Sequence, residues 1–404
     1  MLAQVIFRHG QRVPTTYFNF PTDPPELRRV NRPYELGEMT NEGEMEMYRL
    51  GKQIKQDYGW LLEGGYKPSM LRVISTPMNR TQCSAQIVTA SLLEEEATRL
   101  AVNEFQGTIL SRWIPVPVFT DEYLLWADNV REHCPMNLKS TDLYKQVWED
   151  SQAFVDLLEE YAGIQIDDLV ELNQIEDTLI VHQILPDLVP MADWVNQSVY
   201  DQMHASPDPD DSLDQPKYRF MQGGYLYGQL AEQMRLEIEG LADHKLSLYS
   251  LHDNNLQSLG RYLDLTQLRN SDPDTGSRLV FELHNTTDPK RHIVKVKYAA
   301  KREGEPVELP ISACGEPCYF DEFDRAFDKL SAEQMALDCD KLPLTRRLLD
   351  QKKYDFGFAL AIAVGVLVVF NLLFLLLYAC VCTRKRTPEE TPLFKVPRYT
   401  EDSD

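Results

Sequence analysis

Three arginines and one histidine have the types and spacing of a site that binds and transfers a phosphoryl group. Arg8-His9-Gly10-Gln11-Arg12-Val13-Pro14 follows a short apolar run, and Arg80 follows a second one. A phosphoryl group spreads its charge over three oxygens, and a guanidinium group binds two of them at once. Arginines around one histidine would hold phosphate for attack by a neutral imidazole nitrogen. Gly10 would let the backbone approach the ligand and help to orient the ring.

His252 and Asp253 are candidates for the remaining chemistry. The leaving alkoxide needs a proton, and Asp253 would donate it if its pKa is raised or the pH is low. Asp253 would then activate the attacking water, and His252 would donate a further hydrogen bond to the phosphoryl oxygens. No metal or other cofactor is expected, because the chain has no His-Glu-x-x-His, no P-loop and no paired Cys-x-x-Cys.

The motif at residues 8–14 is specific, and the other groups are not. A chance match to Arg-His-Gly-x-Arg-x-Pro is expected on the order of once in 10⁴ sequences. A lone His-Asp pair, or an arginine such as Arg80 at a helix start, is more often structural. We assign no role to the remaining histidines, which are His133, His182, His204, His244, His284 and His292.

Each polar cluster follows a predicted strand. Residues 3–7, 71–75 and 245–250 are predicted short strands, and they lead into Arg8-His9, Asn79-Arg80 and His252-Asp253, respectively. In open α/β sheets, ligands bind beyond the carboxyl ends of the strands. Segments far apart in the sequence are therefore expected to meet in one pocket.

Between these strands the chain alternates with helical patterns. Helical spacing marks segments that begin after an N-cap at Thr40, near Asn79 and at Tyr225. A hairpin is predicted over residues 279–284 and 292–298. Residues 105 to 215 have helical stretches without strand alternation, and residues 206–212 are expected to form an exposed acidic loop. The pattern predicts an α/β core interrupted by a helical insertion.

The C-terminal region contains a predicted membrane span. Residues 356–381 are apolar for about 26 residues, interrupted only by Asn371, which suffices to cross a bilayer as a helix. Residues 382–404 are polar and Pro-rich and are expected to be a cytosolic tail. The net charge of −22 disfavours unspecific binding to nucleic acid. Any phosphate site must be a local positive pocket.

Targeting signals are weaker. Basic residues flank the span on both sides, so they do not settle its orientation. Sequons at Asn79, Asn196 and Asn285 support a lumenal domain only weakly. No apolar leader precedes residues 3–7, although a lumenal domain would need one.

At these residues the chain resembles the histidine acid phosphatase family, and within it the single-span lysosomal and prostatic-type acid phosphatases. The matching segments are residues 8–14, 79–81, 173–182, 249–253, 281–283 and 314–318. The resemblance implies a phosphoglycerate-mutase-like α/β core with an inserted α-helical cap. We place the core at residues 1–105 and 216–345, and the cap at residues 106–215. One C-terminal transmembrane helix follows at 356–381.

The resemblance also implies an activity: hydrolysis of phosphate monoesters, small molecules or phosphoproteins, through a phosphohistidine intermediate. His9 would be the nucleophile and Asp253 the proton donor. The phosphate ligands would be Arg8, Arg12, Arg80 and His252. The family suggests a homodimer, with the catalytic domain of a single-pass type I protein on the lumenal or extracellular side, in the lysosome or at the cell surface.

The same resemblance gives expectations for the cysteines and the sequons of the chain. Disulfides are implied for Cys134–Cys339 and Cys314–Cys318, with Cys83 as a buried free thiol. Glycosylation is expected at Asn196 and Asn285, but not at Asn79, whose sequon overlaps Arg80. Asn254-Asn255 replaces two threonines that are common in the family, which would alter substrate contacts.

Two alternatives remain open. A phytase or inositol-phosphate phosphatase of the same superfamily can carry the same motif, but its highly charged substrate usually needs an extended basic cleft. A non-catalytic membrane receptor could keep the fold. Loss of a catalytic residue would favour the receptor, and all six residues are present.

Overall fold

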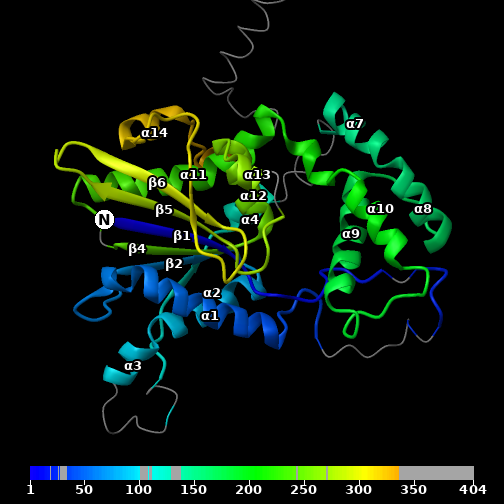
Figure 1. The fold of residues 1–404 in the computed structure, drawn as a ribbon, viewed down its shortest axis with the longest axis horizontal. Helices are drawn as coiled ribbons and strands as arrows, with labels where there is room; N and C mark the ends of the chain where they lie inside the picture. Colours follow the sequence, from blue (N-terminus) through cyan, green and yellow to red (C-terminus); the bar gives the residue numbers. More distant parts are fainter. Residues whose placement is uncertain are drawn as a thin grey trace, which may run out of the picture. The chain divides into compact units, whose positions relative to one another are not determined.

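The structure is a computed structural model. It describes residues 1–18, 20–25, 27, 34–100, 108, 112–128, 138–242, 244–269 and 272–335. These residues belong to one compact unit, Met1–Pro343. At its centre is a seven-stranded sheet in the order β3-β2-β4-β1-β5-β6-β7 (Figure 1). The strands are β1 (Leu2–Arg8), β2 (Leu71–Ser75), β3 (Val118–Thr120), β4 (Leu246–Leu251), β5 (Arg278–Asn285), β6 (His292–Ala299) and β7 (Val307–Leu309).

The strand directions bring the predicted clusters to one edge. β1 and β2 both run parallel to β4, with Arg8 beside Leu251 and Ser75 beside Ser250. The carboxyl ends of these three strands therefore lie side by side, as the sequence predicts. The predicted hairpin is also confirmed, because β5 and β6 pair antiparallel with His284 opposite Ile293.

Helices cover both faces of the sheet (Figure 1). Alternate residues of a strand point to opposite faces. On β1, Val5 and Phe7 join a hydrophobic cluster with α1 (Asn41–Tyr58) and α2 (Asn79–Leu92). Ile6 joins the cluster on the other face. That cluster includes residues of α11 (Pro216–Ile238), α12 (Asp253–Leu263) and α14 (Phe320–Ala326).

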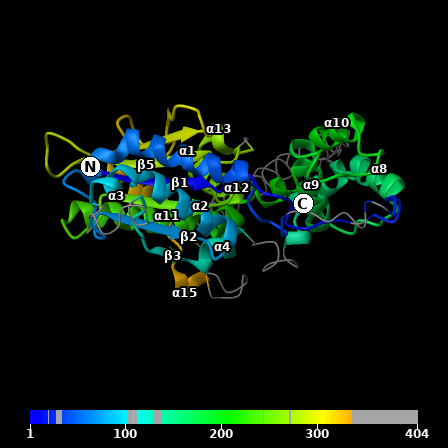
Figure 2. The same cartoon turned by 90° about the horizontal axis from the view of Figure 1, so that it is seen from below.

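A second group of helices lies beyond the end of the sheet, toward which the parallel strands point (Figures 1 and 2). It contains α7 (Asp142–Asp150), α8 (Gln152–Ala162), α9 (Leu169–Ile184), α10 (Gln197–Ala205) and the 3₁₀ helix η5 (Pro209–Leu213). These helices share a further hydrophobic cluster, which Phe20 from the N-terminal segment and Tyr218 and Met221 from the start of α11 join. A separate cluster suits the predicted cap, whose boundaries stay a prediction. The remaining helices are η2 (Gly59–Leu62), α3 (Glu94–Leu100), α4 (Glu122–Asp128), α13 (Thr266–Arg269) and α15 (Ala332–Met335).

Two local predictions are wrong. β3 is a strand within the segment expected to be helical, but it has only 3 residues, too few for an alternation to show. Residues 206–212 are not an exposed loop, because Pro209 and Ser212 are buried in η5. The Asp208 side chain accepts a hydrogen bond from the Asp210 N–H and caps this turn, so the acidic stretch is a helix start.

The cysteines divide into three cases. Cys314 and Cys318 form the expected disulfide. Cys134 and Cys339 lie outside the described residues. Cys83 is exposed, so the expectation of a buried thiol is wrong. It lies on α2 opposite the side that packs on the sheet, whose buried residues are Thr81, Ser84, Ala85 and Val88.

Membrane attachment and glycosylation stay predictions. No helix among the described residues is long and apolar enough to span a bilayer. The predicted span at 356–381 and the tail at 382–404 lie outside the described residues. Asn196 and Asn285 are both exposed, as a glycan requires.

Candidate active site

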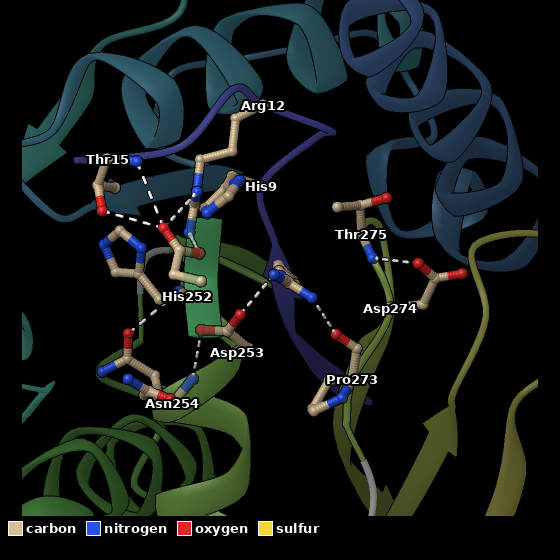
Figure 3. A network of polar contacts seen from close by, with 12 residues as sticks. His9, Arg12, Thr15, His252, Asp253, Asn254, Pro273, Asp274 and Thr275 are labelled. Carbon is tan, nitrogen blue, oxygen red and sulfur yellow. Dashed lines mark hydrogen bonds and ion pairs between the residues drawn. The ribbon is translucent and has the colours of Figure 1, made fainter. Parts of the chain in front are cut away.

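The structure brings together all six predicted site residues at the carboxyl ends of β1, β2 and β4. The rings of His9 and His252 lie edge to face, with centroids 5.4 Å apart. Figure 3 shows both rings in one group with Arg12 and Asp253. Arg80 contacts both histidines, and Arg8 contacts Asp253.

His9 has a defined proton position. Its Nδ1 lies 2.8 Å from the carbonyl oxygen of Gly10. A carbonyl only accepts, so Nδ1 carries the proton and Nε2 keeps its lone pair. Arg80 Nε donates to that Nε2 over 3.2 Å. The nitrogen available for attack on phosphorus is therefore Nε2.

His252 orients Arg80 in this structure. An arginine can only donate, so the 3.3 Å contact with Arg80 Nη2 makes His252 Nδ1 an acceptor. Nε2 then carries the proton and donates to Thr76 Oγ1 at 2.9 Å. Thr76 is in turn bonded to the Thr81 hydroxyl at 2.8 Å. In this arrangement neither nitrogen of His252 has an N–H for phosphate, so its predicted phosphate contact stays a prediction.

Both histidines are held neutral. Burial is the main cause that places the pKa of His9 well below 6.5, and the positive charge of Arg80 adds to it. Burial and Arg80 likewise lower the pKa of His252 to about 3. A neutral imidazole is the nucleophilic form. Burial and the neighbouring arginines thus keep His9 in its neutral form at mildly acidic pH.

Asp253 forms an ion pair with the residue before His9. Arg8 Nη2 lies 2.5 Å from Asp253 Oδ2, and Arg8 Nη1 donates to the Pro273 carbonyl, also over 2.5 Å. Burial raises the pKa of Asp253, but Arg8 and Arg12 outweigh burial and hold this pKa below its ordinary value. A raised pKa, one of the two conditions for proton donation, is therefore absent in the free protein.

Arg12 pairs with a carboxylate that the sequence did not single out. Arg12 Nη2 lies 2.8 Å from Oδ1 of Asp177 on α9, and Nη1 lies 3.2 Å from Oδ2. Asp177 belongs to residues 173–182, which carry part of the family resemblance. That was the only signal for it, because one aspartate on a helix has no local pattern.

The loop after β1 packs tightly on α1. A Cβ on Gly10 would lie 2.3 Å from the carbonyl oxygen of Gly43. Glycine is therefore required there for the approach of two backbones, in addition to the contact between its carbonyl and His9. The buried Glu46 accepts from the Gln11 N–H at 2.8 Å, and Ser84 Oγ accepts from the Gly10 N–H at 3.2 Å. These contacts hold the backbone next to His9 in place.

Asn255 has a structural role. It is buried, its Oδ1 accepts from the His252 N–H at 3.1 Å, and its Nδ2 donates to the Leu124 carbonyl at 3.0 Å. The first helical turn of α12 is thereby closed and tied to α4. The altered substrate contacts expected of Asn254-Asn255 stay a prediction.

No metal site is evident in the described part of the chain. It contains no group of three or more His, Cys, Asp or Glu side chains that could hold a metal ion. The chemistry described below uses protein side chains alone.

Residues 1–299 match the family described as the histidine phosphatase superfamily (branch 2). The chain belongs to this superfamily. The predicted family and phosphatase activity are therefore confirmed. The chain is 26% identical to prostatic acid phosphatase of Rattus norvegicus over 352 residues, which is 83% of this chain and 87% of that protein. It is 24% identical to lysosomal acid phosphatase of the same species over 386 residues, 92% and 86% of the two chains.

Solved structures show the same fold. The phytase from Citrobacter braakii aligns with a TM-score of 0.55 at 16% identity, covering 80% of this chain and 96% of that chain. Hafnia alvei phytase in complex with myo-inositol hexakis sulphate aligns with a TM-score of 0.54 at 16% identity, covering 85% and 98%. At these identities the likeness concerns the fold alone.

Proposed function

We propose that this protein is a membrane-anchored acid phosphatase that hydrolyses phosphate monoesters through a covalent phosphohistidine at His9 Nε2. One observation carries the proposal. His9 presents an unprotonated Nε2 to Arg80, and its buried ring has a pKa well below 6.5. A neutral nucleophile beside guanidinium groups is what attack on a phosphate anion requires.

The first step exchanges one bond to phosphorus for another. A substrate phosphate takes the place of the Arg80–His9 hydrogen bond, so that Arg80 binds a phosphoryl oxygen instead. The Nε2 lone pair then forms the P–N bond as the ester P–O bond breaks. Arg8, Arg12 and Arg80 neutralise the charge on the three equatorial oxygens.

The leaving oxygen takes a proton from Asp253. In the free protein Arg8 keeps Asp253 ionised. A bound phosphate competes for Arg8, which weakens the ion pair and lets burial raise the pKa of Asp253. A monoester monoanion also brings a proton, because the second pKa of a phosphate monoester is about 6. Proton transfer from phosphate to Asp253 would therefore accompany binding.

Water completes the cycle. Asp253, now a carboxylate, accepts a proton from the attacking water. The new P–O bond forms as the P–N bond breaks, which returns His9 to its neutral state and leaves inorganic phosphate. Asp253 ends protonated, and the proton leaves with phosphate as Arg8 pairs with Asp253 again.

The charges around the site favour a singly phosphorylated substrate over inositol polyphosphates. Asp177 pairs with Arg12, and Asp253 pairs with Arg8. Asp272 lies close enough for the charge of Arg8 to lower its pKa, but burial has the larger effect, so the pKa of Asp272 is raised overall. A polyphosphate would bring several further negative charges against these carboxylates. Phytase activity remains the alternative within the superfamily, and a non-catalytic receptor the alternative outside the enzymes.

Anchoring rests on the apolar run at 356–381, which suffices for one span. The acid phosphatase relatives include proteins named lysosomal. We place the catalytic domain on the lumenal or extracellular side, with residues 382–404 in the cytosol.

Substitution of His9 tests the assignment. His9→Ala removes the only group proposed to bond to phosphorus, and we expect less than a few per cent of wild-type activity on an aryl phosphate. The purified variant must keep its circular dichroism spectrum and elution volume. Activity in a folded His9→Ala protein close to that of the wild type would refute a nucleophilic role.

A further inference from the structure

Asp177 contacts two residues of the loop that follows β1 and His9, namely Arg12 and Thr15. Its Oδ1 accepts from Arg12 Nη2 at 2.8 Å, and its Oδ2 accepts from Arg12 Nη1 at 3.2 Å. The same Oδ2 also accepts from the Thr15 hydroxyl at 3.1 Å and the Thr15 N–H at 3.3 Å. Figure 3 labels Arg12 and Thr15, and dashed lines drawn from each of them mark these contacts.

The carboxylate is charged and largely buried. The side chains of Arg12 and Asp177 keep only 12% and 24% of their exposure. Burial raises the pKa of Asp177, but the charge and hydrogen bonds of Arg12 outweigh it and hold this pKa below its ordinary value. A two-point pair between a carboxylate and a guanidinium fixes the plane of the guanidinium as well as its position.

The adjacent residue reinforces the same connection without a charge. Thr178 Oγ1 donates to the Thr16 carbonyl at 2.8 Å. Two successive residues of α9 thus bind the segment from Arg12 to Thr16, which follows the nucleophile in the sequence. α9 itself is held through Leu172, Ile175 and Leu179 in the hydrophobic cluster that it shares with α7, α8 and α10. The position of Arg12 therefore depends on the helical group as well as on the sheet.

We propose that Asp177 is a positioning residue that sets the Arg12 guanidinium for phosphate and for the transferring phosphoryl group. This inference rests on the proposed function. Asp177 itself does not touch substrate; it acts through Arg12. Displacement of a charged group by about 1 Å can cost about 10²-fold in rate, so loss of the contact that holds the guanidinium in place should lower the rate measurably.

Whether substitution of Asp177 weakens or strengthens phosphate binding distinguishes a positioning role from a simple effect of its negative charge. Removal of a negative charge near the site would by itself strengthen the binding of an anion. Loss of a correctly held guanidinium would weaken it. We expect Asp177→Asn to weaken the binding of inorganic phosphate at least about tenfold and to lower kcat/KM for an aryl phosphate about 10²-fold.

A matched control comes from the same helix. Glu171→Gln makes the same charge change at a carboxylate that accepts only from the Asp167 N–H among the contacts described, at 3.2 Å. We expect this variant to stay within about threefold of wild type in kcat/KM, since none of its described contacts involves the segment from Arg12 to Thr16.

A double-mutant cycle with Arg12→Ala is the decisive test. If Asp177 acts through Arg12, Asp177→Asn should change kcat/KM by less than about threefold once Arg12 is absent. An undiminished loss in that background would show that Asp177 supports the fold of α9, and it would overturn the proposal. Tighter or unchanged phosphate binding in the single variant would overturn it as well.

The same cycle with Asp177→Glu covers the case in which Asp177→Asn does not fold. That variant keeps the charge but moves the carboxylate by one methylene group, so we expect a smaller loss that also disappears without Arg12. Calorimetry with inorganic phosphate on full-length protein needs no turnover. If the wild type proved inactive on every monoester, the proposed function would fail, while the effect of Asp177 on phosphate binding would still be measured.

Discussion

Arg8 Nη2 and Asp253 Oδ2 lie 2.5 Å apart, so the arginine proposed to bind phosphate and the proposed proton donor are paired with each other in the free protein. The pairing holds the pKa of Asp253 below its ordinary value although burial opposes this. With its pKa lowered in this way, Asp253 gives up its proton more readily than an ordinary aspartate until Arg8 has another anion to bind. We therefore expect phosphate binding and the protonation of Asp253 to be coupled through Arg8.

Asp253→Asn should affect poor leaving groups far more than good ones. The amide keeps the shape of the side chain but cannot transfer a proton, so we expect phosphorylation by an alkyl phosphate to slow by about 10² to 10⁴. A nitrophenyl phosphate should be slowed much less, because nitrophenolate leaves unaided. Single-turnover measurements on both esters compare the losses.

Asp274→Asn is the control for that comparison. Asp274 is an exposed carboxylate whose Oδ1 accepts from the Thr275 N–H at 2.8 Å, and Figure 3 places it beside the site. We expect it to leave both esters within about threefold. Equal losses on the two esters in Asp253→Asn would mean that Asp253 positions phosphate instead of donating a proton.

The pH profile of activity should not show the loss near pH 6.5 that protonation of an ordinary histidine nucleophile would cause. The pKa of His9 lies well below 6.5, so the nucleophile stays neutral as the pH falls through 6.5 and activity is kept. On the basic side Asp253 carries no proton of its own, since its pKa is lowered. Above about pH 6 the monoester also loses its proton, and kcat/KM for an alkyl phosphate should fall about tenfold per pH unit. A loss of kcat/KM on acidification, centred near 6.5, would contradict this account.

Removal of the predicted span should release the enzyme. Residues 1–350, supplied with a leader, are expected to be secreted as a soluble and active phosphatase, because one span alone would hold the protein in the membrane. The full-length chain, as the control, should stay in the membrane fraction after an alkaline wash. If the truncated chain also stays there, the single-span architecture is wrong.

The sequence allowed the centre of the fold and most of the site to be predicted, for physical reasons. β1 and β4 are buried on both faces, and β2 is buried except at Arg72, so all three appear as short and mainly apolar segments. Because they are parallel, the groups that follow them had to meet at one edge. The edge strand β3 is too short to leave a pattern.

Contacts between distant segments could not be predicted. Asp177 pairs with Arg12 across 165 positions of sequence, and nothing near Asp177 indicates such a partner. The ion pair between Arg8 and Asp253 was also missed, and because it lowers the pKa of Asp253, the condition of a raised pKa is not met in the free protein. The side of α2 on which Cys83 lies follows from packing that only the structure shows.

Trapping the covalent intermediate tests the central claim most directly. Full-length wild-type protein and the Asp253→Asn variant are mixed with an aryl ester labelled in its phosphate and quenched within one turnover, and the label is mapped by peptide. We predict label on Nε2 of His9, in larger amount in Asp253→Asn because water attack is slowed, and none on His9→Ala. Rapid turnover with no label on the protein, or label on a residue other than His9, would contradict the account.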